Sequence, residues 1–188
     1  MTAIVAVRKG KKAVIASDSL TTFGGQHVSQ ENYSSIKIRK IGNSYVAMSG
    51  YSVYKNIMDE YLKDRKAVKL NSKKDIYRFV LKFWKEMKDN YAFVNNQSNS
   101  KSHPFADLNS MFMVLSKRGI FTISGNMTVT QFKQYYAIGS GSEYCMGVMH
   151  ALYDSDLSAR AIARKAIDAS ITFDPWCGGK VRIKELKG

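Results

Sequence analysis

The residue with the clearest potential for chemistry is Thr2, which directly follows Met1. Cells commonly remove a leading methionine when the next residue is small, and removal here would leave Thr2 with a free amine close to its own hydroxyl. An amine with a pKa of roughly 7.7–8.0 can take the proton of a threonine hydroxyl, which is otherwise a weak nucleophile. Thr2 would then supply both nucleophile and base for a hydrolysis, although threonine at this position is also common for reasons unrelated to catalysis.

The sulfur and imidazole side chains indicate no metal chemistry. Cys145 and Cys177 do not form a CxxC pair, and the three histidines are isolated along the chain. Structural zinc needs such ligands at close, regular spacing. A glycine-rich segment at 139–141 could begin a helix or bind phosphate, but it lacks the full GxGxxG pattern. We therefore expect no metal, no cofactor and no disulfide.

The composition is that of a packed globular protein. The 188 residues are 45% hydrophobic and 12% aromatic with only 2 prolines, which excludes a disordered chain and predicts one domain over residues 1–188. No segment has the roughly 18 consecutive apolar residues that span a bilayer, and the start of the chain is unlike a signal peptide. We expect a cytoplasmic protein with no membrane partner.

The formal net charge of +14 would attract any polyanion, so one alternative is a basic polyanion-binding module. The sequence carries no nucleic-acid recognition motif. Its aromatic residues follow core spacing instead of alternating with basic residues. The sequence therefore argues against nucleic acid as the partner.

Hydrophobic periodicity predicts the elements that must position Thr2. Alternating apolar residues predict an opening hairpin from 3–7 and 13–17, and later strands at 35–41, 44–48, 111–115, 120–123, 131–138 and 181–186. Apolar residues at intervals of three or four predict helices after Gly50, from a Ser72 cap to Tyr91, and at 142–153 and 157–171. The polar segment 95–104 predicts an exposed loop. This order predicts an α+β fold with antiparallel sheets between helix pairs.

Six segments add a more specific signal because they occur together and in a fixed order. They are 2–7 with 14–19, 36–41, 47–50, 137–149, 157–163 and 174–179. As a set they resemble the proteasome β-subunit family of N-terminal threonine hydrolases, which includes the HslV-like proteins, from residue 2 to about residue 186. The resemblance is weakest at 51–109. It implies a four-layer αββα sandwich, the N-terminal nucleophile hydrolase fold, and self-association into stacked rings.

The resemblance implies that Thr2 is the catalytic nucleophile and that its freed amine is the base. Asp18 and Lys37 would lie beside it, and the positive charge of the lysine would lower the pKa of the amine. The acid and the lysine stand further apart in this sequence than in the family pattern. We therefore expect an insertion at 26–33, and Lys40 is the alternative lysine.

Four further residues would complete the catalytic machinery. The resemblance implies that Ser140 and Asp174 orient the Thr2 amine and that the backbone N–H of Gly50 stabilises the oxyanion. Cys177 stands where proteasome chains carry serine, and a thiol is a weaker hydrogen-bond partner than a hydroxyl. Without the resemblance, Cys177 would be read as a small buried hydrophobic residue.

The resemblance also implies a pocket for the substrate residue before the cleaved bond. Its lining would be Thr21, Ser35, Met48 and Ser52. A thioether and three neutral hydroxyls offer no charge, so we expect a preference for apolar side chains of medium to large size.

The resemblance thus implies a threonine-type endopeptidase that cleaves unfolded polypeptides through an acyl-enzyme inside stacked rings. The sequence contains nothing that resembles a nucleotide-binding loop, so any energy dependence would come from an ATP-dependent unfoldase partner. The alternative within the same fold is a catalytically silent ring or scaffold subunit that never exposes Thr2.

Overall fold

The structure is a computed structural model that describes residues 2–23, 25–65, 67–91 and 110–186. The predicted loop at 95–104 lies outside these residues. Within the described part of the chain, no helix is both long and apolar enough to cross a membrane.

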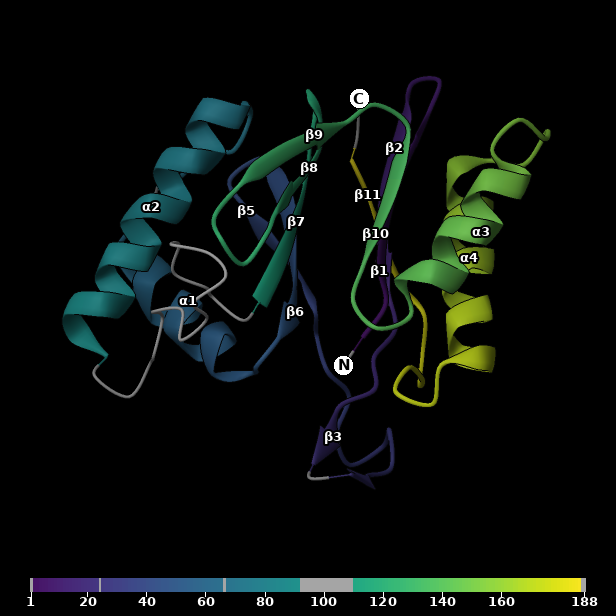
Figure 1. Cartoon of the computed structure of the whole chain (residues 1–188), viewed down its shortest axis with the longest axis horizontal. Coiled ribbons are helices and arrows are strands. Elements are labelled where there is room, and N and C mark those ends of the chain that lie inside the picture. The colour runs from purple at the N-terminus through teal and green to yellow at the C-terminus, as the bar shows by residue number, and fades with distance from the viewer. Residues whose placement is uncertain (1, 24, 66, 92–109, 187–188) are drawn as a thin grey trace, which may run out of the picture.

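Two antiparallel sheets pack face to face, and a pair of helices covers each outer face (Figure 1). The helices are α1 (Val53–Lys63) and α2 (Lys73–Asn90) on one side, and α3 (Ser142–Leu152) and α4 (Ala159–Phe173) on the other. This arrangement confirms the predicted α+β class and the four-layer αββα sandwich.

The first sheet carries the start of the chain and has the order β10-β1-β2-β11. Its strands are β1 (Ile4–Lys9), β2 (Lys12–Ser17), β10 (Tyr135–Ile138) and β11 (Arg182–Leu186). β1 is buried on both faces, because Val5 packs toward α3 and α4 whereas Ile4 packs toward the second sheet. This double burial explains why the opening hairpin is apolar almost throughout instead of strictly alternating.

The second sheet has the order β5-β6-β7-β8-β9. Its strands are β5 (Ile38–Ile41), β6 (Ser44–Gly50), β7 (Ser110–Ser116), β8 (Gly119–Ile123) and β9 (Val129–Phe132). Phe83 of α2 meets Phe112 of β7 edge to face, with ring centroids 6.3 Å apart. The predicted apolar stripe of α2 therefore lies in the core between this sheet and its helices. The predicted Ser72 cap is present, since its side chain accepts from the Asp75 N–H at 3.1 Å.

Two predicted strands need correction. Residues 131–138 form two strands, because β9 pairs with β8 whereas β10 crosses to the first sheet and pairs with β1. The strand predicted from Ser35 begins only at Ile38, since the Ser35 N–H donates to the Ser19 carbonyl at 3.2 Å instead of joining the sheet. A short hairpin of β3 (Thr22–Phe23) and β4 (Gln26–His27), which the periodicity does not predict, leads into the region assigned to an insertion.

Candidate active site

Thr2 and Asp18 meet because the opening hairpin folds back on itself. Thr2 lies just before β1 and Asp18 directly follows β2, and the pairing of Ile4 with Ser17 brings these ends together. The Thr2 Oγ1 hydroxyl donates to Asp18 Oδ1 at 2.7 Å, and the Ala3 N–H donates to the same oxygen at 3.0 Å. Thr2 is 3% exposed and Asp18 is fully buried. The hairpin thus holds a hydroxyl against a carboxylate in a site shielded from water.

Backbone groups hold the second oxygen of the Asp18 carboxylate. Asp18 Oδ2 accepts from the N–H groups of Leu20 and Gly178, each at 3.2 Å. A charge can stay inside a protein when hydrogen bonds of this kind satisfy it. The carboxylate is therefore fixed where it can orient the Thr2 hydroxyl and attract a cation.

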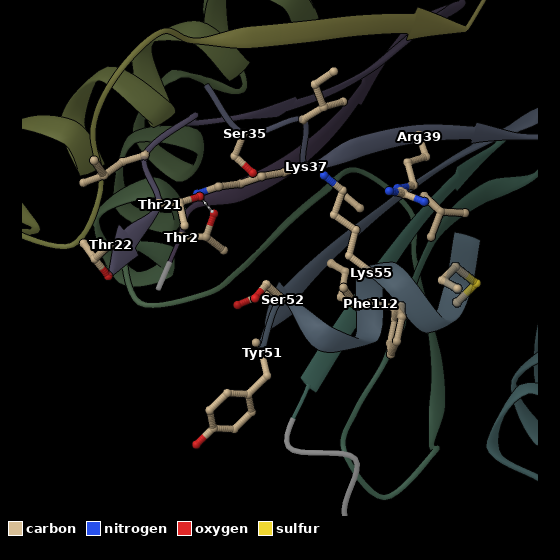
Figure 2. A pocket seen from close by; sticks show the side chains of 18 of the residues that line it. Thr2, Thr21, Thr22, Ser35, Lys37, Arg39, Tyr51, Ser52, Lys55 and Phe112 are labelled. Carbon is tan, nitrogen blue, oxygen red and sulfur yellow. Dashed lines mark hydrogen bonds between the residues drawn. The ribbon is translucent and has the colours of Figure 1, made fainter. Parts of the chain in front are cut away.

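Lys37 supplies that cation. Its Nζ lies 2.7 Å from Asp18 Oδ1 and also donates to Thr2 Oγ1, and Figure 2 shows the side chain extending to Thr2. Burial is the largest influence on the pKa of Lys37 and lowers it, and the Asp18 carboxylate raises it again without restoring the ordinary value. Lys40 is exposed on β5, opposite Tyr45. The structure thus places Lys37, and not Lys40, against Thr2.

A second set of groups approaches the nitrogen of Thr2. The Thr2 N–H donates to Ser140 Oγ at 3.2 Å, and Ser140 Oγ lies 4.0 Å from Cys177 Sγ. Cys177 Sγ in turn donates to Asp174 Oδ2 at 3.2 Å. The structure thus brings Ser140 to the Thr2 nitrogen and places Asp174 behind it, in contact with Ser140 and Cys177.

The surroundings shift the pKa values of Asp174 and Cys177 in opposite directions. Burial disfavours the charged form of Asp174. Hydrogen bonds from the Trp176 N–H and from the Ser140 and Cys177 side chains outweigh burial and lower the pKa of this carboxyl. Burial, reinforced by the negative charges of Asp18 and Asp174, raises the pKa of the Cys177 thiol to about 12. Cys177 is therefore a protonated donor near neutral pH and a poor nucleophile.

Two glycines let the chain pass close to Thr2. Gly139 has a φ of +98°, and a Cβ there would lie 2.1 Å from the Thr2 carbonyl oxygen. Gly141 donates its N–H to the same oxygen at 3.3 Å, and a Cβ on it would lie 2.7 Å from Ser170 Cβ. Close backbone approach therefore explains the glycines at 139–141 without a phosphate ligand.

Thr2 borders a cavity of about 330 Å³ formed by residues of β5, β6, α1 and the segment that follows β2. Its lining includes every residue expected in the substrate pocket together with the expected oxyanion glycine, namely Thr21, Ser35, Met48, Ser52 and Gly50. Apolar walls come from Ile41, Val46, Met58 and Phe112. The cavity is therefore continuous with the cluster of Thr2, Asp18 and Lys37 and is large enough to hold a side chain.

Arg39 and Lys55 also line this cavity, so the expectation of a pocket without charge is wrong. Arg39 belongs to β5 and pairs with Asp59, whose Oδ2 accepts from Arg39 Nη2 at 2.8 Å. The sequence contains a partial signal for Arg39, because it lies two residues from Lys37 in the strand predicted at 35–41 and side chains two apart share a face of a strand. Lys55 has no such signal, because its approach to the cavity depends on how α1 packs.

Comparisons with known proteins match nearly the whole chain. A sequence model described as "Proteasome subunit" matches residues 2–186. The ATP-dependent protease subunit HslV of Bartonella quintana (strain Toulouse) is 30% identical over 189 residues, which cover 98% of this chain and 89% of that protein. The ATP-dependent protease subunit HslV of Caldicellulosiruptor saccharolyticus is 25% identical over 187 residues, covering 98% of each chain.

Solved structures give the same picture. Thiobacillus denitrificans BPH superposes with a TM-score of 0.87 at 29% identity, covering 98% of this chain and 97% of that one. The same protein in complex with epoxomicin superposes with a TM-score of 0.86 at 29% identity, covering 99% and 100% of the two chains. Trypanosoma brucei HslV, at 20% identity with 99% of each chain covered, shares the fold with a TM-score of 0.68.

Proposed function

The chain belongs to the proteasome subunit family of threonine peptidases, and we propose that it cleaves peptide bonds in unfolded polypeptides through Thr2 once Met1 has been removed. The observation that carries this proposal is the contact of Thr2 Oγ1 with both Asp18 and Lys37, next to a cavity that can hold a substrate side chain.

In the proposed reaction, the freed Thr2 amine takes the proton of Oγ1 while Oγ1 attacks the substrate carbonyl carbon. The positive charge of Lys37 stabilises the oxygen as it loses its proton and disfavours protonation of the amine. The C–N bond of the substrate then breaks, and the amine returns the proton to the leaving nitrogen. Water hydrolyses the resulting ester and frees Thr2 for another cycle.

The remaining groups orient these atoms. The Gly50 N–H faces the developing oxyanion, a donor role whose loss in other enzymes costs about 2.7–4 kcal/mol of barrier. Ser140 accepts a hydrogen bond from the Thr2 nitrogen, and Cys177 and Asp174 hold Ser140 in turn. This chain of contacts turns the amine toward Oγ1 and its lone pair toward the proton.

The proposal extends to the assembly. Two similar proteins are ATP-dependent protease subunits. We expect this chain to form stacked homo-oligomeric rings in the cytoplasm and to rely on a separate ATP-driven unfoldase for folded substrates. Its own contribution is peptide hydrolysis, which needs no nucleotide.

Thr2→Ala tests the proposal. Peptide hydrolysis should fall to background, because the variant has the amine but lacks the nucleophilic oxygen, while assembly stays intact. Thr172→Ala removes an exposed hydroxyl from the last turn of α4, where it donates to the Asp168 carbonyl of the same helix, and should leave hydrolysis unchanged. An active Thr2→Ala variant would contradict the proposal, and so would wild-type protein that retains Met1 by intact mass yet hydrolyses peptides.

A further inference from the structure

One cation that lines the cavity beside Thr2 has no carboxylate partner among the described residues. We propose that this cation, Lys55, makes the enzyme select an acidic side chain at the substrate residue whose carbonyl Thr2 attacks. Glutamate should be preferred over aspartate at that position. The inference rests on the proposed function and adds the substrate class to it.

Lys55 differs from the other cations of the cavity in its lack of a carboxylate partner among the described residues. The described residues that line the cavity include Lys37, Arg39 and Lys55 but no carboxylate. Asp18 neutralises Lys37 from outside the lining, and Asp59 neutralises Arg39 in the same way. Among the described residues, none forms a hydrogen bond or an ion pair with the Lys55 side chain. Counted over the described residues, the cavity therefore has one positive charge that no carboxylate neutralises.

The position of Lys55 suits a long acidic side chain. Figure 2 shows the Lys55 side chain extending from α1 toward β5, the strand that carries Arg39. Met48 and Phe112 supply apolar lining to the same cavity. A glutamate side chain has methylene groups to contact such walls and a carboxylate at their end to meet the Lys55 amine. Aspartate carries the same charge on a shorter stem.

Electrostatics favour this class over the alternatives. A carboxylate gains a charge-assisted hydrogen bond from a lysine amine in a partly enclosed site, where water screens the pair less than at the surface. A basic side chain would meet a like charge. An apolar side chain would displace water from the Lys55 amine without replacing its hydrogen bonds, which is unfavourable. The same cation therefore attracts one class of substrate and repels another.

Fluorogenic peptides that differ only at the residue before the reporter test the inference. Glu and Gln are the decisive pair because they match in shape and differ in charge, and Asp, Leu and Lys complete the panel. For the wild-type protein we expect kcat/KM for Glu to exceed that for Gln by about tenfold or more, which corresponds to one well-formed charged contact. Faster cleavage of the Leu peptide than of the Glu peptide would overturn the inference.

Substitutions on α1 assign the effect to one side chain. Lys55→Met should abolish the advantage of Glu over Gln, and Lys55→Glu should shift the preference to Lys. Lys63→Met is the matched control, because Lys63 ends the same helix, is 68% exposed and lies outside the cavity lining. It removes the same formal charge and should leave the ratio unchanged. An unchanged ratio in Lys55→Met would also overturn the inference.

The outcomes separate the two proposals. If the assembled wild-type protein with a free Thr2 cleaves no peptide of the panel, the proposed function fails and the inference falls with it. If it cleaves peptides with an apolar or a flat preference, the peptidase stands and only the role of Lys55 fails. The wild-type ratio decides by itself if a Lys55 variant does not fold.

Discussion

Burial and the Asp18 carboxylate act on the Lys37 amine in opposite directions. Burial lowers its pKa and the ion pair raises it, and burial is the stronger effect. The pair is also almost completely removed from water, with Lys37 8% and Asp18 0% exposed in their side chains. In such a place a cation serves two purposes, since it neutralises Asp18 and polarises the Thr2 hydroxyl.

Lys37→Ala should therefore lower kcat for peptide hydrolysis by about 100-fold or more, the scale of losing one preorganised donor to a developing negative charge. It should also lower the free energy of unfolding by about 3–5 kcal/mol, because the buried Asp18 carboxylate loses its cationic partner. Lys40→Ala is the control, since Lys40 is exposed on β5, and both quantities should stay near the wild-type values. Equal losses of kcat in the two variants would show that Lys37 has no special role.

The two cysteines should resist alkylation. Burial is the main cause that raises the pKa of both the Cys145 and the Cys177 thiols to about 12. The thiolate is the reactive form, so near pH 8 both groups stay protonated and unreactive, unlike a free cysteine with a pKa of about 8.5. Iodoacetamide should leave peptide hydrolysis intact, as measured before and after treatment. Inactivation that tracks modification of Cys177, and that Cys177→Ser prevents, would indicate a cysteine nucleophile instead.

Residues whose positions follow from local pairing were predictable from the sequence. Thr2 and Asp18 flank a hairpin, so predicting the hairpin already brings them together. Arg39 and Lys55 were not predicted in the cavity, because their approach depends on how closely α1 packs on the second sheet. That distance is a tertiary quantity, and periodicity gives only the face of each element.

At the scale of elements, the turn that packs against Thr2 determines where the proposed nucleophile lies. The turn that follows β10 runs so close to Thr2 that Gly139 leaves no room for a side chain. The turn between β1 and β2 also contains a glycine with positive φ, Gly10 at +57°, but a Cβ there would meet no atom within 4 Å. The two glycines thus differ in steric environment and share a backbone conformation that disfavours side chains.

Gly139→Ala should lower kcat by about 100-fold, because a displacement of Thr2 by the added methyl group is enough to misplace the attacking oxygen. Gly10→Ala carries only the penalty of the left-handed conformation, about 1–2 kcal/mol, and should leave kcat unchanged. Peptide hydrolysis and thermal unfolding of both variants provide the comparison. A normal kcat in Gly139→Ala would mean that the exact position of Thr2 is not what the turn controls.

The ends of some strands could not be predicted from the sequence, although the elements themselves could. The opening hairpin, the capped α2 and the helix pairs carry periodicity that the fold preserves. In residues 131–138 the periodicity does not reveal the break between two strands, because both halves are good strand formers. Only their partners, β8 for the first half and β1 for the second, show that they belong to different sheets. Residues 35–37 likewise have strand character, yet the contact of Ser35 with Ser19 draws them out of the sheet toward the catalytic cluster.

At the scale of the whole molecule, the outer layer of α3 and α4 leaves aromatic side chains in water. Tyr144 and Phe173 contact each other with ring centroids 5.8 Å apart, although both are exposed. Trp176 is exposed on the segment that follows α4. Apolar surface of this kind is commonly covered by another protein, which agrees with the proposed self-association.

Light scattering should therefore give a particle mass several times the 21.2 kDa of one chain. Phe173→Asp places a charge on the exposed aromatic cluster and should shift the distribution to smaller species, whereas the neighbouring Thr172→Ala should not. A monodisperse wild-type monomer at micromolar concentration would contradict the ring assembly.

The most direct test of the whole account is to identify the residue that reacts. Purified protein is incubated with an electrophile directed at N-terminal threonines, and in parallel with epoxomicin, the compound found in complex with Thiobacillus denitrificans BPH. Intact mass and peptide mapping then locate any adduct. The account predicts a chain without Met1 that carries the adduct on Thr2, and no adduct in Thr2→Ala. A chain that retains Met1, or an adduct on another residue such as Cys177, would contradict it.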